Sequence, residues 1–214
     1  MTRLGIIPAA GMATRIGGVA KELLPISDKR TLIHRAVEVL ESVPVDRTVV
    51  ITNQLKMQSH ARELQDKQVG YVLQHGQLDA WSAIVETFPY AGELNYYLMP
   101  DTYQPSLFEP DYKHDITFGC FTTPFPSRFG VMYDGQIIDK SDVFDGSIQE
   151  AWGTVIWSKR VVEFWQSRIS EITTHTQAFN MAIKEFGHGI YTIPYYFDIA
   201  TFADYKRLLA HVSD

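Results

Sequence analysis

The first half of the chain alternates between two patterns of apolar and polar positions. Short apolar, often β-branched runs predict buried strands, and apolar residues at helical spacing predict amphipathic helices. The expected strands are residues 3–8, 48–52, 69–73 and 96–99, and the expected helices are residues 32–40, 54–65 and 79–88. This βαβαβαβ order predicts an α/β fold with a doubly wound, mainly parallel sheet.

The second half of the chain follows a less regular pattern. Its expected strands are residues 116–122, 129–133, 136–138 and 154–157, and its expected helices are residues 159–169, 175–186 and 202–212. The pair Asp134-Gly135 is typical of a tight hairpin turn. Because no repeat or linker divides the sequence, we expect a single domain over residues 1–214, with residues 1–110 and 111–214 as its two halves.

Composition narrows the classes of function. The chain has 214 residues, of which 45% are hydrophobic and 21% charged, which is typical of an ordinary globular protein. A formal net charge of -6 disfavours a nucleic-acid or membrane-surface binder, and no apolar run is long enough to span a bilayer. The single cysteine, Cys120, excludes an intramolecular disulfide and a cysteine metal cluster, and its apolar surroundings indicate a buried thiol. No pair of histidines has the spacing of a zinc site. We expect a cytoplasmic location.

The loop that follows the first strand carries the strongest chemical signal. Residues 8–21 read PAAGMATRIGGVAK. Small side chains let backbone N–H groups approach an anion closely, and Arg15 and Lys21 can neutralise a polyphosphate. The loop is not a Walker A motif, since Gly-Lys-Ser/Thr is absent. We expect it to bind a triphosphate; the alternative is a flexible Gly/Ala turn with two solvated cations.

Two further polar positions, Gln74 and Asp101, lie where ligands of such a sheet are expected, beyond the carboxyl ends of the strands; a third, Asp198, lies near the C-terminus and is singled out by the resemblance given below. Gln74 follows the third strand, and its carboxamide can both donate to and accept from a nucleobase edge. Asp101 follows the fourth strand, and Asp198 lies in the segment FDIATFADY. Two carboxylates far apart in sequence suit a hard cation such as Mg²⁺. The alternatives are a polar strand end at Gln74 and simple helix capping by Thr201 and Asp204.

Taken together, these segments resemble the nucleotide-sugar pyrophosphorylases, or sugar-1-phosphate nucleotidyltransferases. Their signature reads AAGxGTR, a spacer and PKxLLP, and this chain has AAGMATR, a short spacer and AKELLP. The resemblance implies a Rossmann-like, GT-A-like α/β/α sandwich. It also implies transfer of a nucleoside monophosphate from a nucleoside triphosphate to a sugar 1-phosphate, with nucleotide bound by residues 1–110 and acceptor by residues 111–214.

The same resemblance implies a role for each matching position. Arg15, Lys21 and Asp101 would be catalytic, with Arg15 on the pyrophosphate leaving group, and Asp101 and Asp198 would hold Mg²⁺. The implied nucleotide-binding residues are Ala10, Gly11, Met12, Ala13, Thr14, Gln74 and Ala80. The implied acceptor-binding residues are Gly130, Asp139, Lys140 and Gly153. Asp139 and Lys140 could equally be an exposed pair that follows a hairpin strand.

The chain also departs from that family. The altered positions are Ala13, Ala20, Ala80, Pro100, Ser141 and Ala200. The short spacer between Arg15 and Lys21 resembles the molybdenum-cofactor guanylyltransferases, which share the fold. A pterin guanylyltransferase and a non-catalytic nucleotide-binding regulator therefore remain alternatives, while a plain structural domain would leave the joint placement of these motifs to chance. The expected partners are a nucleoside triphosphate and a phosphorylated sugar-like small molecule, with no nucleic acid and no membrane; the base, the acceptor and any homo-oligomer stay open.

Overall fold

The structure is a computed structural model that describes residues 1–12, 19–107, 113–139 and 150–212. Its strands are β1 (Arg3–Pro8), β2 (Pro25–Ser27), β3 (Arg30–Thr31), β4 (Arg47–Thr52), β5 (Val69–Leu73), β6 (Leu94–Leu98), β7 (Thr102–Tyr103), β8 (Ile116–Thr122), β9 (Val131–Tyr133), β10 (Gln136–Ile138), β11 (Glu150–Ser158), β12 (Gly189–Thr192) and β13 (Phe197–Asp198). Its α-helices are α1 (Leu32–Glu41), α2 (Met57–Glu63), α3 (Ala80–Glu86), α4 (Lys159–Ser167), α5 (His175–Phe186) and α6 (Phe202–Val212).

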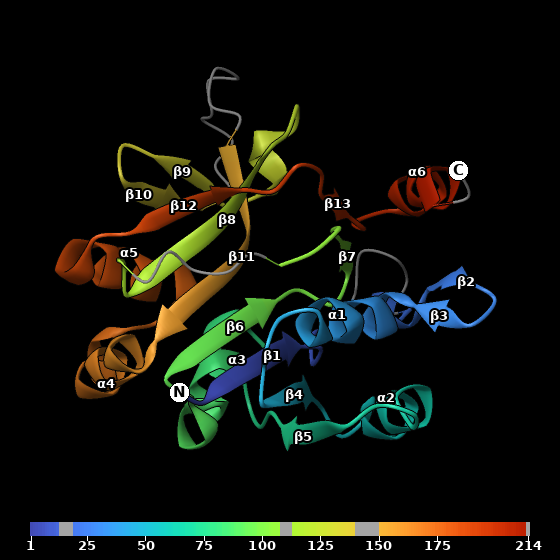
Figure 1. Ribbon diagram of the computed structural model, residues 1–214, viewed down its shortest axis with the longest axis horizontal. Helices are drawn as coiled ribbons and strands as arrows, with labels where there is room; N and C mark the ends of the chain where they lie inside the picture. The colour runs from blue at the N-terminus through green and yellow to red at the C-terminus, as the bar shows by residue number, and fades with distance from the viewer. Residues whose placement is uncertain (13–18, 108–112, 140–149, 213–214) are drawn as a thin grey trace.

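One large sheet organises the described part of the chain. Its nine strands follow the order β10-β9-β11-β6-β1-β4-β5, and β8 joins β11 to β12 (Figure 1). β1 pairs in parallel with β4 and β6, and β4 pairs in parallel with β5, so the predicted α/β fold with parallel strands is confirmed. β11 runs antiparallel to β6. Strands from both predicted halves therefore share one sheet.

Apolar side chains alternate between the two faces of the sheet, and helices cover both. On one face, Ile7 and Val50 pack with apolar residues of α1. On the other face, Leu4 and Ile6 belong to a core that includes residues of α3, α4 and α5, among them Trp165. Trp81 and Cys120 are buried in this second core, as expected. None of the described helices has the length and apolar character needed to cross a membrane.

The C-terminal segment packs against the N-terminal half. β13 pairs antiparallel with β7, which sets Asp198 opposite Thr102. Beyond it, Ile199 and Leu208 of the α6 region form a small core with Leu32 at the start of α1. The short strands β2, β3, β7, β12 and β13 were not among the predicted elements. Through the pairing of β13 with β7, residues near position 200 reach the carboxyl end of β6.

Most predicted elements are confirmed, with shifts at their ends. Strands 3–8, 69–73, 116–122 and 136–138 and helices 175–186 and 202–212 have the predicted bounds. The helix expected from residue 54 begins at residue 57, because Asn53 Oδ1 accepts the backbone N–H groups of Leu55 and Lys56 and holds a turn there. The strand expected from residue 129 begins at residue 131, after a 3-10 turn, and the strand expected from residue 154 begins at residue 150.

Candidate active site

Lys21 and Asp101 meet at the carboxyl end of the parallel strands. Lys21 begins a 3-10 turn behind the first loop, Asp101 follows β6, and Lys21 Nζ lies 3.4 Å from Asp101 Oδ2. A cavity of about 170 Å³ opens between them and the loop after β1; it is lined by Pro8, Ala9, Gly11, Lys21, Glu22, Lys56, Met99, Pro100 and Asp101. The structure thus brings two of the predicted catalytic residues together beside the described part of the predicted triphosphate loop.

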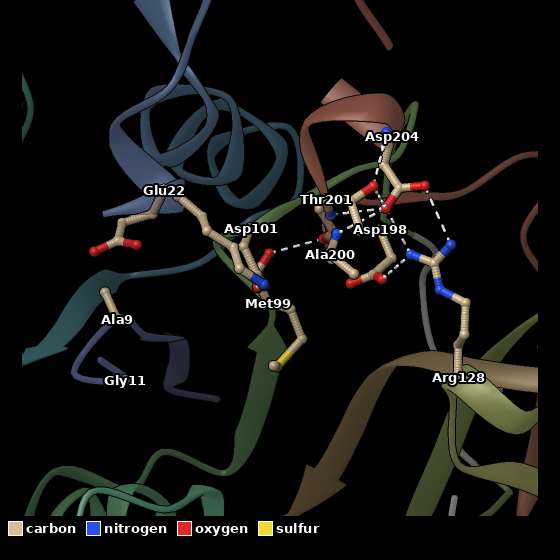
Figure 2. Close-up of polar contacts among 12 residues, drawn as sticks. Ala9, Gly11, Glu22, Met99, Asp101, Arg128, Asp198, Ala200, Thr201 and Asp204 are labelled. Atoms are coloured by element: carbon tan, nitrogen blue, oxygen red, sulfur yellow. Dashed lines mark hydrogen bonds and ion pairs between the residues drawn. The ribbon is translucent and has the colours of Figure 1, made fainter. Parts of the chain in front are cut away.

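Asp198 lies next to Asp101. The backbone N–H of Ile199 donates to the carbonyl of Asp101 at 3.1 Å, and Figure 2 shows the two carboxylates on neighbouring segments. Burial raises the pKa of Asp101, Lys21 opposes that rise, and the charge of Asp198 adds to it, so the pKa ends above its ordinary value. A divalent cation beside Asp101 would relieve the repulsion between its carboxylate and the charge of Asp198, so the two residues fit Mg²⁺.

Protein atoms alone do not complete a cation site here. Among the described residues, no group of three or more His, Cys, Asp or Glu side chains is placed to hold a metal ion. A cation at Asp101 and Asp198 would take its other ligands from water and phosphate oxygens, as Mg²⁺ commonly does in phosphoryl-transfer sites.

Arg128 is a site residue whose role the sequence did not reveal. Its guanidinium donates from Nη2 to Asp198 Oδ2 at 2.9 Å and from Nη1 and Nη2 to Asp204 at 3.1 and 2.9 Å (Figure 2). Asp204 also accepts the backbone N–H of Thr201 at 2.8 Å, and the Thr201 hydroxyl accepts the backbone N–H of Asp204 at 3.2 Å, so the capping of the last helix that was the alternative interpretation of this segment is present. Burial raises the pKa of Asp204, but hydrogen bonds from Arg128, Thr201 and Arg207 outweigh it and bring the pKa well below its ordinary value.

A cavity of about 410 Å³ extends from these carboxylates over the second half of the sheet. Its lining residues are Lys21, Ala80, Tyr97, Met99, Asp101, Thr102, Arg128, Phe129, Gly130, Asp139, Trp152, Gly153, His175, Tyr196 and Asp198. The predicted acceptor residues Gly130, Asp139 and Gly153 therefore share one cavity with the predicted metal ligands. Lys140 lies outside the described residues.

Gly130 and Gly153 make room for aromatic rings. A Cβ on Gly130 would overlap the indole nitrogen of Trp152, and a Cβ on Gly153 would overlap the ring of Tyr196. The Tyr196 hydroxyl donates to the carbonyl of Gly153 at 3.3 Å. These glycines shape the aromatic wall of the cavity. The packing of the two rings is sufficient to explain why neither position has a side chain.

Among the described residues, the hydroxyl of Tyr97 and the indole N–H of Trp152 are buried in the wall of this cavity and find no hydrogen-bond partner. Burial raises the pKa of Tyr97, with smaller contributions from Asp101 and Asp79, so its hydroxyl stays protonated at neutral pH. Buried polar groups normally find partners. A polar group of a bound molecule is one way to supply them.

A third cavity, of about 470 Å³, lies on the other side of the loop after β1. It is lined by Met12, Asn53, Gln54, Leu55, Leu73, Gln74, His75, Gly76 and Leu78. Gln74 Nε2 donates to the carbonyls of Gln77 and Asp79, both at 2.9 Å. Both amide hydrogens are therefore used inside the loop, and the expected paired contact of Gln74 with a base edge is not available in this arrangement; its Oε1 is the atom left to accept a hydrogen bond.

The comparisons with known proteins agree with this geometry. Residues 5–94 match the family model described as the MobA-like NTP transferase domain. This match covers less than half of the chain and lies in its N-terminal part. The matched range includes the predicted nucleotide-binding residues and Lys21 but ends before Asp101, so the pairing of Asp101 with Asp198 rests on the structure.

Solved structures share the fold over nearly the whole chain. A protein described as a glucose-1-phosphate thymidylyltransferase from Bacillus anthracis, in complex with sucrose, is 19% identical with a TM-score of 0.81, covering 100% of this chain and 96% of its own. The inositol-1-phosphate CTP transferase of T. maritima is 16% identical with a TM-score of 0.75, covering 100% and 97%. A UDP-glucose pyrophosphorylase from Acinetobacter baumannii is 15% identical with a TM-score of 0.75, covering 99% and 93%.

No curated protein sequence matches the chain. The family match and the shared fold together support a nucleotidyltransferase enzyme. Within the matched residues, Gly11 borders the cavity of about 170 Å³, Met12 borders the cavity of about 470 Å³, and Ala10 is buried in the core beside them. Ala13, Thr14 and Arg15 lie outside the described residues, so their roles stay predictions.

Proposed function

We propose that this protein transfers a nucleoside monophosphate from a nucleoside triphosphate to a sugar 1-phosphate or a related phosphorylated small molecule, with release of pyrophosphate. The observation that carries this proposal is the 410 Å³ cavity. It joins Lys21, Asp101 and Asp198 to the predicted acceptor residues, and the cavity beside the triphosphate loop shares Lys21 and Asp101 with it.

In the proposed reaction, an oxygen of the acceptor phosphate attacks the α-phosphorus of the triphosphate. A new P–O bond forms, the bond from the α-phosphorus to the bridging oxygen of the β-phosphate breaks, and pyrophosphate leaves. No side-chain nucleophile is required: Cys120 is buried and its pKa is raised to about 12. The residues of the site act by positioning the phosphates and neutralising their charge.

Lys21 is the cation best placed to act on the reacting phosphates, because its ammonium group borders both cavities. Asp101 and Asp198 would hold Mg²⁺, which when bound neutralises and orients the phosphate oxygens. Arg128 fixes the orientation of Asp198: two hydrogen bonds hold the Arg128 guanidinium on Asp204, and a third joins it to Asp198. Arg15 would hold the pyrophosphate group and remains a prediction.

The walls of the acceptor cavity support a sugar-like ligand. Aromatic rings of Tyr97, Phe129, Trp152 and Tyr196 line it together with the carboxylate of Asp139. Rings that offer apolar faces, beside groups that accept or donate hydrogen bonds, suit a ring-shaped polyol. The names of the structural neighbours, which refer to glucose and inositol phosphates, point to the same class of acceptor.

A second candidate function is guanylyl transfer to a pterin cofactor, which is favoured by the description of the matching family model as MobA-like. Under either function, the partners are small molecules. The absence of nucleic-acid and membrane partners and the cytoplasmic location are expectations from the sequence that belong to this proposal.

Release of pyrophosphate tests the proposal. The protein is incubated with Mg²⁺ and each of ATP, GTP, CTP and UTP, with sugar 1-phosphates and inositol 1-phosphate added singly. We expect release that requires one triphosphate and one phosphorylated acceptor together. Release that requires GTP and a pterin phosphate would establish the second candidate, and tight triphosphate binding without release under any condition would overturn both in favour of a regulator.

A further inference from the structure

The short turn of residues 53–56 lies beside the predicted triphosphate loop. It follows β4, which pairs in parallel with β1, so the chain leaves both strands at the same edge of the sheet. The backbone N–H of Ala9 still donates to the carbonyl of Ile51 at 2.7 Å. Beyond that contact the two segments are connected by side chains of the turn.

Two side chains of the turn bind three consecutive carbonyl groups of the loop. Lys56 Nζ donates to the carbonyl of Ala9 at 3.2 Å and to the carbonyl of Gly11. Asn53 Nδ2 donates to the carbonyl of Ala10 at 2.5 Å. The carbonyls of residues 9, 10 and 11 therefore all point toward the turn.

Lys56 is held in place by a buried acid. Its ammonium group lies 2.7 Å from Glu22 Oε1, and the Lys56 side chain is 12% exposed against 5% for Glu22. The same oxygen lies 2.9 Å from His60 Nε2, and His60 Nδ1 lies 2.8 Å from Thr52 Oγ1. An ammonium group has three hydrogens to donate. The carbonyls of Ala9 and Gly11 and the Glu22 carboxylate account for all three, so Lys56 has a fixed geometry.

This geometry sets the direction of the backbone N–H groups. In a planar trans peptide, the N–H of one residue points opposite to the C=O of the residue before it. Because the carbonyls of residues 9–11 point toward the turn, the N–H groups of Ala10, Gly11 and Met12 point away from it. Successive N–H groups that point to one side form a concave anion site. Gly11 and Lys21 line the cavity of about 170 Å³ beside them.

We propose that Lys56 and Asn53 are positioning residues that orient the backbone N–H groups of residues 10–12 toward the triphosphate. This inference rests on the proposed function, because it takes the loop as the triphosphate site. Lys56 itself also lines the cavity of about 170 Å³; the role inferred for it is exerted through the backbone of the loop, and Glu22 and His60 keep its ammonium group from turning away. Residues 53–60 carry no recognisable phosphate-binding pattern in the sequence, so the role of this segment comes from its contacts in the fold.

Inorganic tripolyphosphate is the probe that tests this inference, because it carries no base and no sugar. Its affinity is measured by calorimetry for the natural protein and for Lys56→Met, Asn53→Ala and Lys67→Met. Lys67 is a matched control, since it is also ion-paired, to Glu41 at 2.8 Å, but lies beyond the C-terminal end of α2 and lines none of the cavities described above. We expect affinity to fall about 10-fold in Lys56→Met and several-fold in Asn53→Ala, as loss of charge-assisted and neutral hydrogen bonds implies. Lys67→Met should match the natural protein.

A spectroscopic measurement separates positioning from simple charge attraction. The ¹H–¹⁵N resonance of Gly11 should shift when tripolyphosphate binds the natural protein and shift much less in both turn variants. Asn53→Ala removes no charge, so unchanged affinity and an unchanged Gly11 shift in that variant would overturn the positioning role. Thermal unfolding verifies that each variant is folded; Asn53→Ala serves as the test if Lys56→Met is not.

The outcomes also separate this inference from the proposed function. If the natural protein binds neither tripolyphosphate nor any nucleoside triphosphate, the proposed function fails and the inference fails with it. If the natural protein binds them and both turn variants bind equally well, only the inference is overturned.

Discussion

The guanidinium of Arg128 and the carboxylate of Asp204 form a two-pronged ion pair, with Nη1–Oδ1 and Nη2–Oδ2 separations of 3.1 and 2.9 Å. The pair joins the turn before β9 to the first turn of α6, and its Nη2 also reaches Asp198. A planar guanidinium that is bound by two bonds to one carboxylate presents a rigid donor to a second. Asp204 therefore controls how Asp198 is oriented in the site.

Replacement of Asp204 by asparagine should destabilise the protein. The Asp204 side chain is 5% exposed, and the change leaves Arg128 with a neutral partner and weakens the cap of α6. We expect the free energy of unfolding to fall by about 2–3 kcal/mol, less than the roughly 3–5 kcal/mol for a fully buried ion pair, because Arg128 is 29% exposed. Urea denaturation measures this loss. Glu93→Gln, which removes a surface partner of Lys159 at 4.0 Å, should change it by less than about 0.5 kcal/mol.

The stabilisation from Asp204 should depend on pH in a defined direction. The folded protein lowers the pKa of Asp204. Its stabilising contribution is therefore complete above the pKa of an unfolded aspartate, about 3.9, and is lost as the pH falls through the lowered pKa. The difference in unfolding free energy between the natural protein and Asp204→Asn should be smaller at about pH 3 than at about pH 7. An equal difference at both pH values would contradict the assignment.

Alanine at Gly130 or Gly153 should disrupt the aromatic wall of the acceptor cavity. Each added Cβ would overlap a ring, that of Trp152 or of Tyr196. We expect each variant to lose about 1–3 kcal/mol of stability, which is the usual cost of overpacking, and to lose acceptor-dependent turnover. Gly70→Ala is the control, because a Cβ there would meet Val49 at an ordinary 3.6 Å. Wild-type stability in both wall variants would show that the rings pack differently.

Replacement of Tyr97 by phenylalanine should affect stability and activity in opposite directions. The Tyr97 hydroxyl is buried and has no hydrogen-bond partner in the described part of the chain, so its removal should stabilise the protein by up to about 1 kcal/mol. If the hydroxyl binds the acceptor, kcat/KM for the acceptor should fall about 10-fold. Thermal unfolding and steady-state kinetics measure the two effects. Tyr133→Phe, at a tyrosine that is 52% exposed, should change neither; a Tyr97→Phe variant that is both less stable and fully active would contradict this account.

The sequence was sufficient to predict the fold. The apolar patterns of β1, β4, β5 and β6 are strong, and the alternation of strands and helices along the chain allows few topologies. The loop after β1 and the carboxylate after β6 could be located for the same reason, since functional loops follow the carboxyl ends of parallel strands. Lys21 and Asp101 are accordingly in contact, as expected.

The connections that complete the site could not be predicted in the same way. β7 and β13 are two residues long each, too short to show any periodicity, although their pairing places Asp198 beside Asp101. Arg128 contacts carboxylates that are 70 and 76 residues away, and no local pattern encodes such a contact. For Gln74, the sequence indicated the position beside a cavity but not the hydrogen bonds of the side chain. Its amide hydrogens bind the carbonyls of its own loop.

The most direct test of nucleotidyl transfer is the rate of acceptor-dependent pyrophosphate release by Lys21→Ala and Asp101→Ala. The two side chains lie 3.4 Å apart at the junction of the nucleotide and acceptor cavities. Lys29→Ala, at an exposed lysine of the β2–β3 turn, is the control. We predict that both site variants stay folded by thermal unfolding and release no detectable pyrophosphate, while Lys29→Ala retains full activity. Near-wild-type release by either site variant would contradict the central claim.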